Sequence, residues 1–118
     1  MSQHYQVSRE GEIHLMELEL PQQMDAAEFD KLNDAIEAAA DGAIAGRWVL
    51  DLSNAQYIGS AMLGLMVNLR QRIKAGGGRL VLCGLSQHLT RALATCSLHT
   101  FFVTVPTRAE AIRKASGR

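Results

Sequence analysis

Two short apolar segments on either side of a helix-like run constrain this chain most. Residues 48–52 are apolar except for Asp51, and residues 80–83 are apolar throughout. Continuous apolar strands of this kind are usually buried on both faces, as in a parallel sheet. Neighbouring parallel strands need a long crossover connection, usually a helix. The two segments and the run between them therefore predict a strand–helix–strand unit.

The same alternation extends through the rest of the chain. Residues 4–8 and 13–20 predict two strands joined in a hairpin at Glu10-Gly11. Capping boxes at 25–28 and 107–110 predict helix starts. Further elements are expected at 61–75 (helix), from 86 (helix) and at 101–105 (strand). We predict an α/β fold with a mostly parallel central sheet, an N-terminal hairpin and about four helices. Residues 1–118 are expected to form one domain, with 114–118 as a flexible tail.

The charge balance and cysteine content exclude several classes of function. Twelve basic residues balance twelve acidic ones, so the net charge gives no reason to expect nucleic acid binding. No apolar run approaches the ~20 residues of a membrane span, and the N-terminus is polar, so we expect a cytoplasmic protein without membrane insertion. The two cysteines form no disulfide framework, and no spacing of Cys and His predicts a metal site. We therefore expect no metal and no cofactor.

Ser60 lies where the strand at 48–52 gives way to the next helix. Its hydroxyl is expected to cap that helix, and the backbone N–H groups there also favour an anion, such as a phosphate on the same hydroxyl. An ordinary helix cap is the simpler interpretation, but the carboxyl ends of parallel strands are where α/β folds place their sites. A nucleophilic serine is disfavoured, because Ile58 and Met62 replace the glycines of Gly-x-Ser-x-Gly.

The helix after Ser60 has a predicted inner stripe and a predicted contact surface. The inner stripe consists of Met62, Met66, Leu69 and Ile73. Gly64 falls on the outer face, where glycine costs ~1 kcal/mol relative to alanine, and it leaves a shallow spot that a partner can approach. Candidate partner-binding residues are Gly59, Ser60, Ala61, Gly64, Leu65 and Asn68. Asp51 is expected to accept backbone hydrogen bonds in the loop before Ser60 and so to shape it.

Two sequence runs resemble the STAS family, the sulfate-transporter and anti-sigma-factor-antagonist domains. They read Val49-Leu50-Asp51-Leu52-Ser53 and Tyr57-Ile58-Gly59-Ser60-Ala61-Met62-Leu63-Gly64. The glycine turn and strand at 77–85 and the last strand and helix also resemble the family in order. The family often reads Asp-Ser-Ser-Gly-Leu where this chain reads Gly59-Ser60-Ala61-Met62-Leu63.

The resemblance implies a non-enzymatic regulatory switch. In stand-alone bacterial members, the unphosphorylated domain binds an anti-sigma factor that is also a serine kinase, which releases the sigma factor. The kinase phosphorylates a serine at this loop–helix junction, and a phosphatase reverses the reaction. By resemblance Ser60 matches that serine, and Asp25 takes the place of the acidic stretch that shapes the neighbouring loop.

Three other interpretations stay open. One is a STAS scaffold or transport-associated domain that binds a protein partner without phosphorylation. Another is a domain that binds a small ligand or a nucleotide at the same strand ends. A small esterase is the remotest of the three, and a serine-reactive probe would distinguish it.

Overall fold

One mixed sheet organises the computed structural model, which describes residues 4–57 and 59–117. Its strands, in spatial and chain order, are β1 (Tyr5–Glu10), β2 (Ile13–Leu20), β3 (Arg47–Ala55), β4 (Arg79–Cys83) and β5 (Val103–Val105). β1 pairs antiparallel with β2, and each later strand pairs parallel with the one before it. The predicted hairpin and mostly parallel sheet are therefore confirmed.

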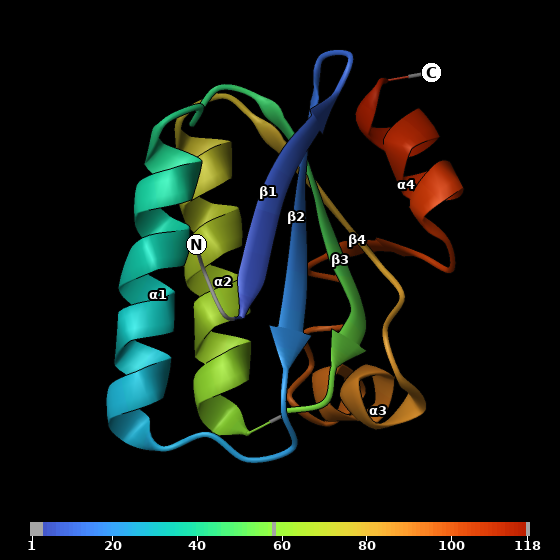
Figure 1. Cartoon of the computed structure of the whole chain (residues 1–118). Coiled ribbons are helices and arrows are strands. Elements are labelled where there is room, and N and C mark those ends of the chain that lie inside the picture. Colours follow the sequence, from blue (N-terminus) through green and yellow to red (C-terminus); the bar gives the residue numbers. More distant parts are fainter. Residues whose placement is uncertain (1–3, 58, 118) are drawn as a thin grey trace.

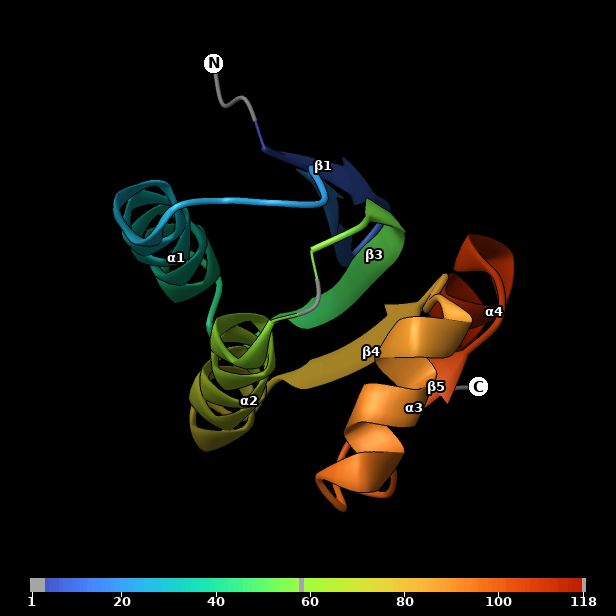
Figure 2. The ribbon, with the colours of Figure 1, turned by 90° about the horizontal axis from the view of Figure 1, so that it is seen from below.

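Helices cover both faces of this sheet. They are α1 (Ala26–Asp41), α2 (Ser60–Ala75), α3 (Gln87–Thr95) and α4 (Arg108–Ala115). α1 and α2 lie side by side on one face, α4 covers the other, and α3 lies near the carboxyl ends of the parallel strands (Figures 1 and 2). The predicted α/β class with four helices is confirmed. No helix in the described part of the chain is long and apolar enough to cross a membrane.

Two apolar clusters, one on each side of the sheet, explain the continuous apolar strands. On β3, Trp48, Leu50 and Leu52 point into a main cluster shared with α1, α2 and α3, whereas Val49 belongs to a second cluster under α4. Successive side chains of a strand point to opposite faces, so a strand covered on both sides is apolar at nearly every position.

In β2, apolar and polar residues do not alternate strictly, and burial of both faces explains this as well. Ile13 and Leu15 belong to the second cluster, and Met16, Leu18 and Leu20 to the main cluster. Both faces are buried, so apolar residues occur at both odd and even positions of this strand. The pairing of β2 with β3 does shift its register, but it does so later, between Glu17 and Glu19.

The prediction that residues 114–118 form a flexible tail is wrong for its first two residues. Lys114 and Ala115 belong to α4, and Ala115 is fully buried in the second cluster. The side chain of Arg47, on β3, also donates a hydrogen bond to the carbonyl oxygen of Ser116 at 3.1 Å. Packing against the sheet therefore keeps this part of the chain ordered.

Candidate functional site

Ser60 is the first residue of α2 and is exposed. The prediction that its side chain caps the helix is wrong. The cap is Gly59, whose backbone is extended (φ −66°, ψ 170°) and whose carbonyl oxygen accepts a hydrogen bond from the Met62 N–H at 2.9 Å. Among the residues that the structure describes, no side chain caps α2. Modification of the exposed hydroxyl would therefore leave the capping of α2 intact.

The start of α2 differs electrostatically from the starts of the other helices. Asp25, Ser86 and Thr107 each accept a backbone N–H bond with their side chains and cap α1, α3 and α4. The first turn of α2 has neither such a cap nor an acidic residue. A negative charge near a helix N-terminus stabilises it by about 0.3–1 kcal/mol. An anion on Ser60 would therefore sit in a favourable place that no acidic side chain of that turn occupies.

The loop that leads to Ser60 is held against its neighbours. The Gln56 N–H donates to the carbonyl oxygen of Leu20 at 3.0 Å, which ties the end of β3 to the end of β2. Tyr57 packs on Phe29 of α1, with ring centroids 5.4 Å apart. A Cβ atom at position 59 would lie 2.7 Å from the Tyr57 hydroxyl oxygen, so Tyr57 covers Gly59. Ile58 lies outside the described residues.

A shallow depression lies beside Gly59. Its lining comes from three separate parts of the fold, the segment after β2, the loop before α2 and α3: Gln22, Gln56, Tyr57, Gly59 and His88. His88 belongs to α3, so this depression joins α3 to the start of α2. The candidate site therefore extends beyond α2 itself.

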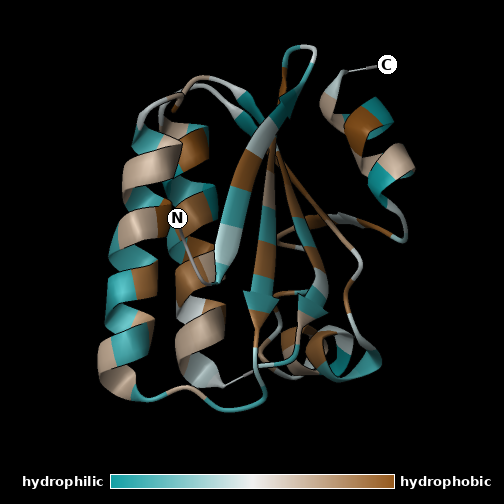
Figure 3. Cartoon of the chain, viewed as in Figure 1, coloured by the Kyte–Doolittle hydropathy of each residue, from teal (hydrophilic) through white to brown (hydrophobic). Residues whose placement is uncertain are grey.

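The outer face of α2, which we define as Ser60, Ala61, Gly64 and Asn68, is exposed. A Cβ atom added at Gly64 would meet no atom within 4 Å beyond the adjacent backbone of its own helix, so this position is open to a partner. The very start of α2 is pale in Figure 3, and the outer face there carries small residues, Ser60, Ala61 and Gly64. The structure thus places four of the predicted contact residues together, with Gly59 half-buried beside them.

Leu65 does not belong to this surface. It is only 3% exposed and lies in the main cluster, so its prediction as a contact residue is wrong. The reason is that α1 packs beside α2 and covers that flank. Arg72 on the same flank pairs with Asp41 of α1 at 2.9 Å. The predicted inner stripe of Met62, Met66, Leu69 and Ile73 is confirmed as buried.

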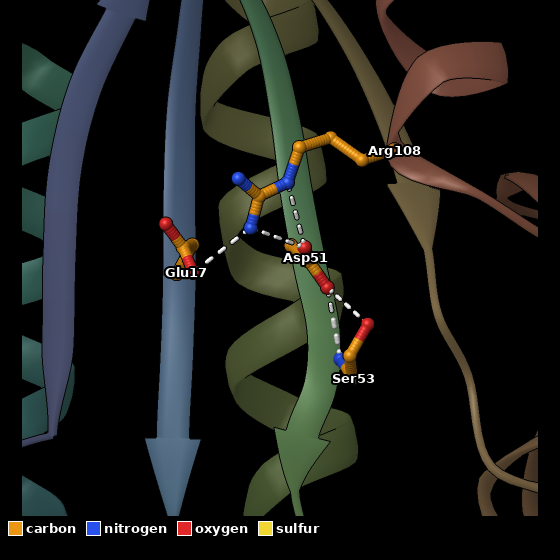
Figure 4. A network of polar contacts seen from close by, with 4 residues as sticks. All are labelled: Glu17, Asp51, Ser53 and Arg108. Carbon is orange, nitrogen blue, oxygen red and sulfur yellow. Dashed lines mark hydrogen bonds and ion pairs between the residues drawn. The ribbon is translucent and has the colours of Figure 1, made fainter.

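Asp51 forms the centre of a polar network on the opposite face of the sheet (Figure 4). Its Oδ1 accepts hydrogen bonds from the Ser53 N–H at 2.9 Å and the Ser53 hydroxyl at 2.6 Å. Its Oδ2 accepts from Nε and Nη2 of Arg108 at 3.0 and 2.7 Å. Nη2 of Arg108 also lies 2.9 Å from a carboxylate oxygen of Glu17. The network therefore fastens the start of α4 to β2 and β3.

This network adds an unpredicted partner, Arg108, to the role predicted for Asp51. Burial by itself would raise the pKa of Asp51, but the hydrogen bonds from Ser53 and Arg108 outweigh burial and hold that pKa below its usual value. The predicted backbone hydrogen bond is present, from the Ser53 N–H, although Ser53 belongs to β3 in the structure. A role of Asp51 in shaping the loop before Ser60 stays a prediction. Sequence reasoning missed Arg108, although a carboxylate within a buried strand is itself a signal that a cation lies nearby.

Asp25 acts at the start of α1. Its Oδ1 accepts the Glu28 N–H at 2.8 Å, which confirms the predicted cap. This bond orients the first turn of α1. A role of Asp25 in shaping the loop beside Ser60 stays a prediction.

Comparisons with known proteins agree with this architecture. A family model described as STAS domain matches residues 5–111. A comparison with curated proteins found no match.

Solved structures share the fold at low sequence identity. A STAS domain anti-sigma-factor antagonist protein from Planctomyces limnophilus has a TM-score of 0.81 at 22% identity, over 95% of this chain and 97% of that one. A putative anti-sigma factor antagonist from Thermotoga maritima has a TM-score of 0.82 at 17% identity, over 95% and 94%. The Bacillus cell fate determinant SpoIIAA, in its phosphorylated form, has a TM-score of 0.66 at 18% identity, over 93% and 97%.

Proposed function

Because the chain belongs to the STAS domain family, we propose that it is an anti-sigma-factor antagonist, a non-enzymatic switch controlled by phosphorylation of Ser60. The observation that carries this proposal is the position of Ser60 at the start of α2. The residue is exposed, no side chain caps the helix and no acid lies in its first turn. The solved structure of the phosphorylated Bacillus relative supports the general idea, since a protein of this fold accepts a phosphate.

The proposed switch works through the charge of one surface. In the unphosphorylated state, the outer face of α2 offers small side chains on which a partner can pack closely. A phosphate on Ser60 brings about −1.5 to −2 charges at neutral pH. A partner that covers this face would have to desolvate that charge, which is costly unless the charge is paired. Phosphorylation therefore weakens binding while the fold stays the same.

The partners follow from the family resemblance. We propose an anti-sigma factor with serine kinase activity as the protein that binds the outer face of α2 and transfers the phosphate. A phosphatase would restore the binding-competent form. In this scheme the kinase and the phosphatase supply the chemistry, and this chain supplies a binding surface and an acceptor hydroxyl.

Mapping of the phosphate tests the proposal. The protein is incubated with ATP and the serine-kinase anti-sigma factors of its own genome, and the products are analysed by tandem mass spectrometry. We expect a single phosphate on Ser60, and none on the Ser60→Ala variant. Ser53→Ala is the matched control, because Ser53 is a second exposed serine and its hydroxyl is bonded to Asp51. Phosphate on another residue, or none with a kinase that binds the protein, would show that Ser60 is not the acceptor.

A further inference from the structure

The acidic residues of this chain are distributed very unevenly. Of the twelve, eleven lie between positions 10 and 51, and the twelfth is Glu110. Residues 52–109 contain no aspartate or glutamate at all, although they contain five arginines and one lysine. The net charge of zero therefore results from an acidic part and a basic part of the sequence. The sign of the charge on each part of the surface favours partners of the opposite charge.

In the folded structure, acidic residues and basic residues also predominate on different helices. α1 carries five of the acidic residues: Glu28, Asp30, Asp34, Glu37 and Asp41. α2 carries only basic ones, and its Arg72 pairs with Asp41 and Glu37 at 2.9 and 3.1 Å across the contact with α1. The boundary between the two signs of charge therefore runs between α1 and α2, which lie side by side in Figure 1.

On the other side of α2, towards α3, the described surface is basic. Arg91 and His88 are exposed on α3, opposite the buried Leu89 and Leu93. Among the ion pairs of the described residues, none involves Arg91. Arg70 of α2 lies 4.0 Å from the centroid of the Phe101 ring, which fixes a second positive charge between α2 and the segment after α3.

The exposed residues of α3 share an end of the molecule with Ser60. His88 lines the same depression as Gly59, the residue before Ser60. Both α3 and the start of α2 lie near the carboxyl ends of the parallel strands (Figures 1 and 2). We define the acid-free face as the outer face of α2 together with His88 and Arg91 of α3. It contains no carboxylate, because all of its residues fall within 52–109.

We propose that the acid-free face docks an acidic surface of the partner protein, and that phosphate on Ser60 acts by cancelling the positive charge of this face. The proposal rests on the proposed function and specifies the chemistry of the partner. A phosphate of about −1.5 to −2 charges outweighs the single positive charge of Arg91 on this face. Complementary charges chiefly raise the association rate and select partners, so losing them slows docking.

Two other occupants are less compatible with this surface. The acidic α1 of a second copy could meet the acid-free face, but this head-to-tail contact would repeat from copy to copy into a ring or an open chain. Nucleic acid binding normally draws on a dense cluster of Lys and Arg that contact several phosphates. On the acid-free face, Arg91 is the single arginine. An acidic protein surface needs only a few complementary charges.

An acidic peptide of ten glutamates serves as the probe for this surface. Amide shifts of the 15N-labelled protein are followed by NMR at about 0.02 M and about 0.5 M salt, since exposed charges are screened at high salt. We expect shifts at Ser60, His88 and Arg91 at low salt and their loss at high salt. Arg91→Glu and Ser60→Asp should each weaken peptide binding at least about threefold.

Arg113→Glu is the matched control, because Arg113 is an exposed arginine on α4, across the sheet. This variant should bind the peptide like the wild type. Equal effects of Arg91→Glu and Arg113→Glu, or shifts confined to α4, would overturn the proposal. So would tighter binding of a ten-nucleotide thymidine strand, or salt-sensitive self-association that the peptide does not affect. The peptide experiment needs no kinase, so its failure would leave the mapped phosphate on Ser60 untouched.

Discussion

Met66→Ala should lower the free energy of unfolding by about 2–5 kcal/mol. Met66 has no exposed surface and lies in the main cluster between the sheet and the helices. Truncation removes its buried methylene and thioether groups and leaves a cavity that the surrounding strands can only partly close. Urea denaturation of the wild type and the variant measures the loss. A variant as stable as the wild type would mean that α2 presents a different face to the sheet.

Gly64→Gln is the matched substitution on the outer face of α2. The new side chain would meet no atom within 4 Å of its Cβ, and glutamine favours a helix over glycine by somewhat less than ~1 kcal/mol. Stability should therefore stay the same or rise slightly. Binding of the anti-sigma factor should fall, because the added side chain projects into the proposed contact. If Gly64→Gln is as unstable as Met66→Ala, position 64 does not lie on the exposed face of α2.

Asp51→Asn should destabilise the protein by about 1–2 kcal/mol at pH 7, a range that allows for the partial exposure of Arg108. Asparagine keeps the shape of the side chain and an acceptor for Ser53, but it loses the charge that pairs with Arg108. Asp51 itself is only 6% exposed, so its charge-assisted bonds are shielded from water. Urea denaturation at pH 7 measures the difference. Glu19→Gln, an exposed acid on β2, should change little.

The pH dependence of this difference follows from the pKa of Asp51. That pKa is lower in the folded state than the usual value near 3.9. A carboxylate of this kind stabilises the fold above its unfolded pKa, and the contribution is lost as the pH falls through the folded pKa. The wild type and Asp51→Asn should therefore differ most between about pH 5 and pH 7, and converge below about pH 4. A difference that stays constant down to pH 3 would show that the charge of Asp51 does not stabilise the fold.

The secondary structure could be predicted because it is encoded in local patterns. The bounds predicted for β2 agree with Ile13–Leu20, and α2 ends at Ala75 as predicted but begins one residue earlier, at Ser60. β2 is bounded by turn residues and α2 is followed by three glycines, so the sequence marks where these elements end. The order of strands and helices then leaves few topologies, since parallel crossovers are right-handed.

The contacts between helices and strands could not be predicted from local sequence patterns. Leu65 lies at the edge of the apolar stripe of α2, and only the position of α1 decides that it is buried. The partnership of Asp51 with Arg108 spans 57 residues and has no local pattern. The cap at Gly59 rather than Ser60 depends on the backbone angles at the turn, and serine, asparagine, aspartate and glycine are all acceptable caps.

The central claim is that phosphate on Ser60 controls the binding of an anti-sigma factor to the outer face of α2. Isothermal titration of that factor into three forms of the protein tests it most directly: unmodified, phosphorylated on Ser60, and Ser60→Asp. We predict that the phosphorylated form binds at least about tenfold more weakly, a loss of ~1.4 kcal/mol. Ser60→Asp should be weakened in the same direction. All three should melt alike, because an acid in the first turn of a helix is tolerated or stabilising. Equal affinity of the phosphorylated and unmodified forms would contradict the account.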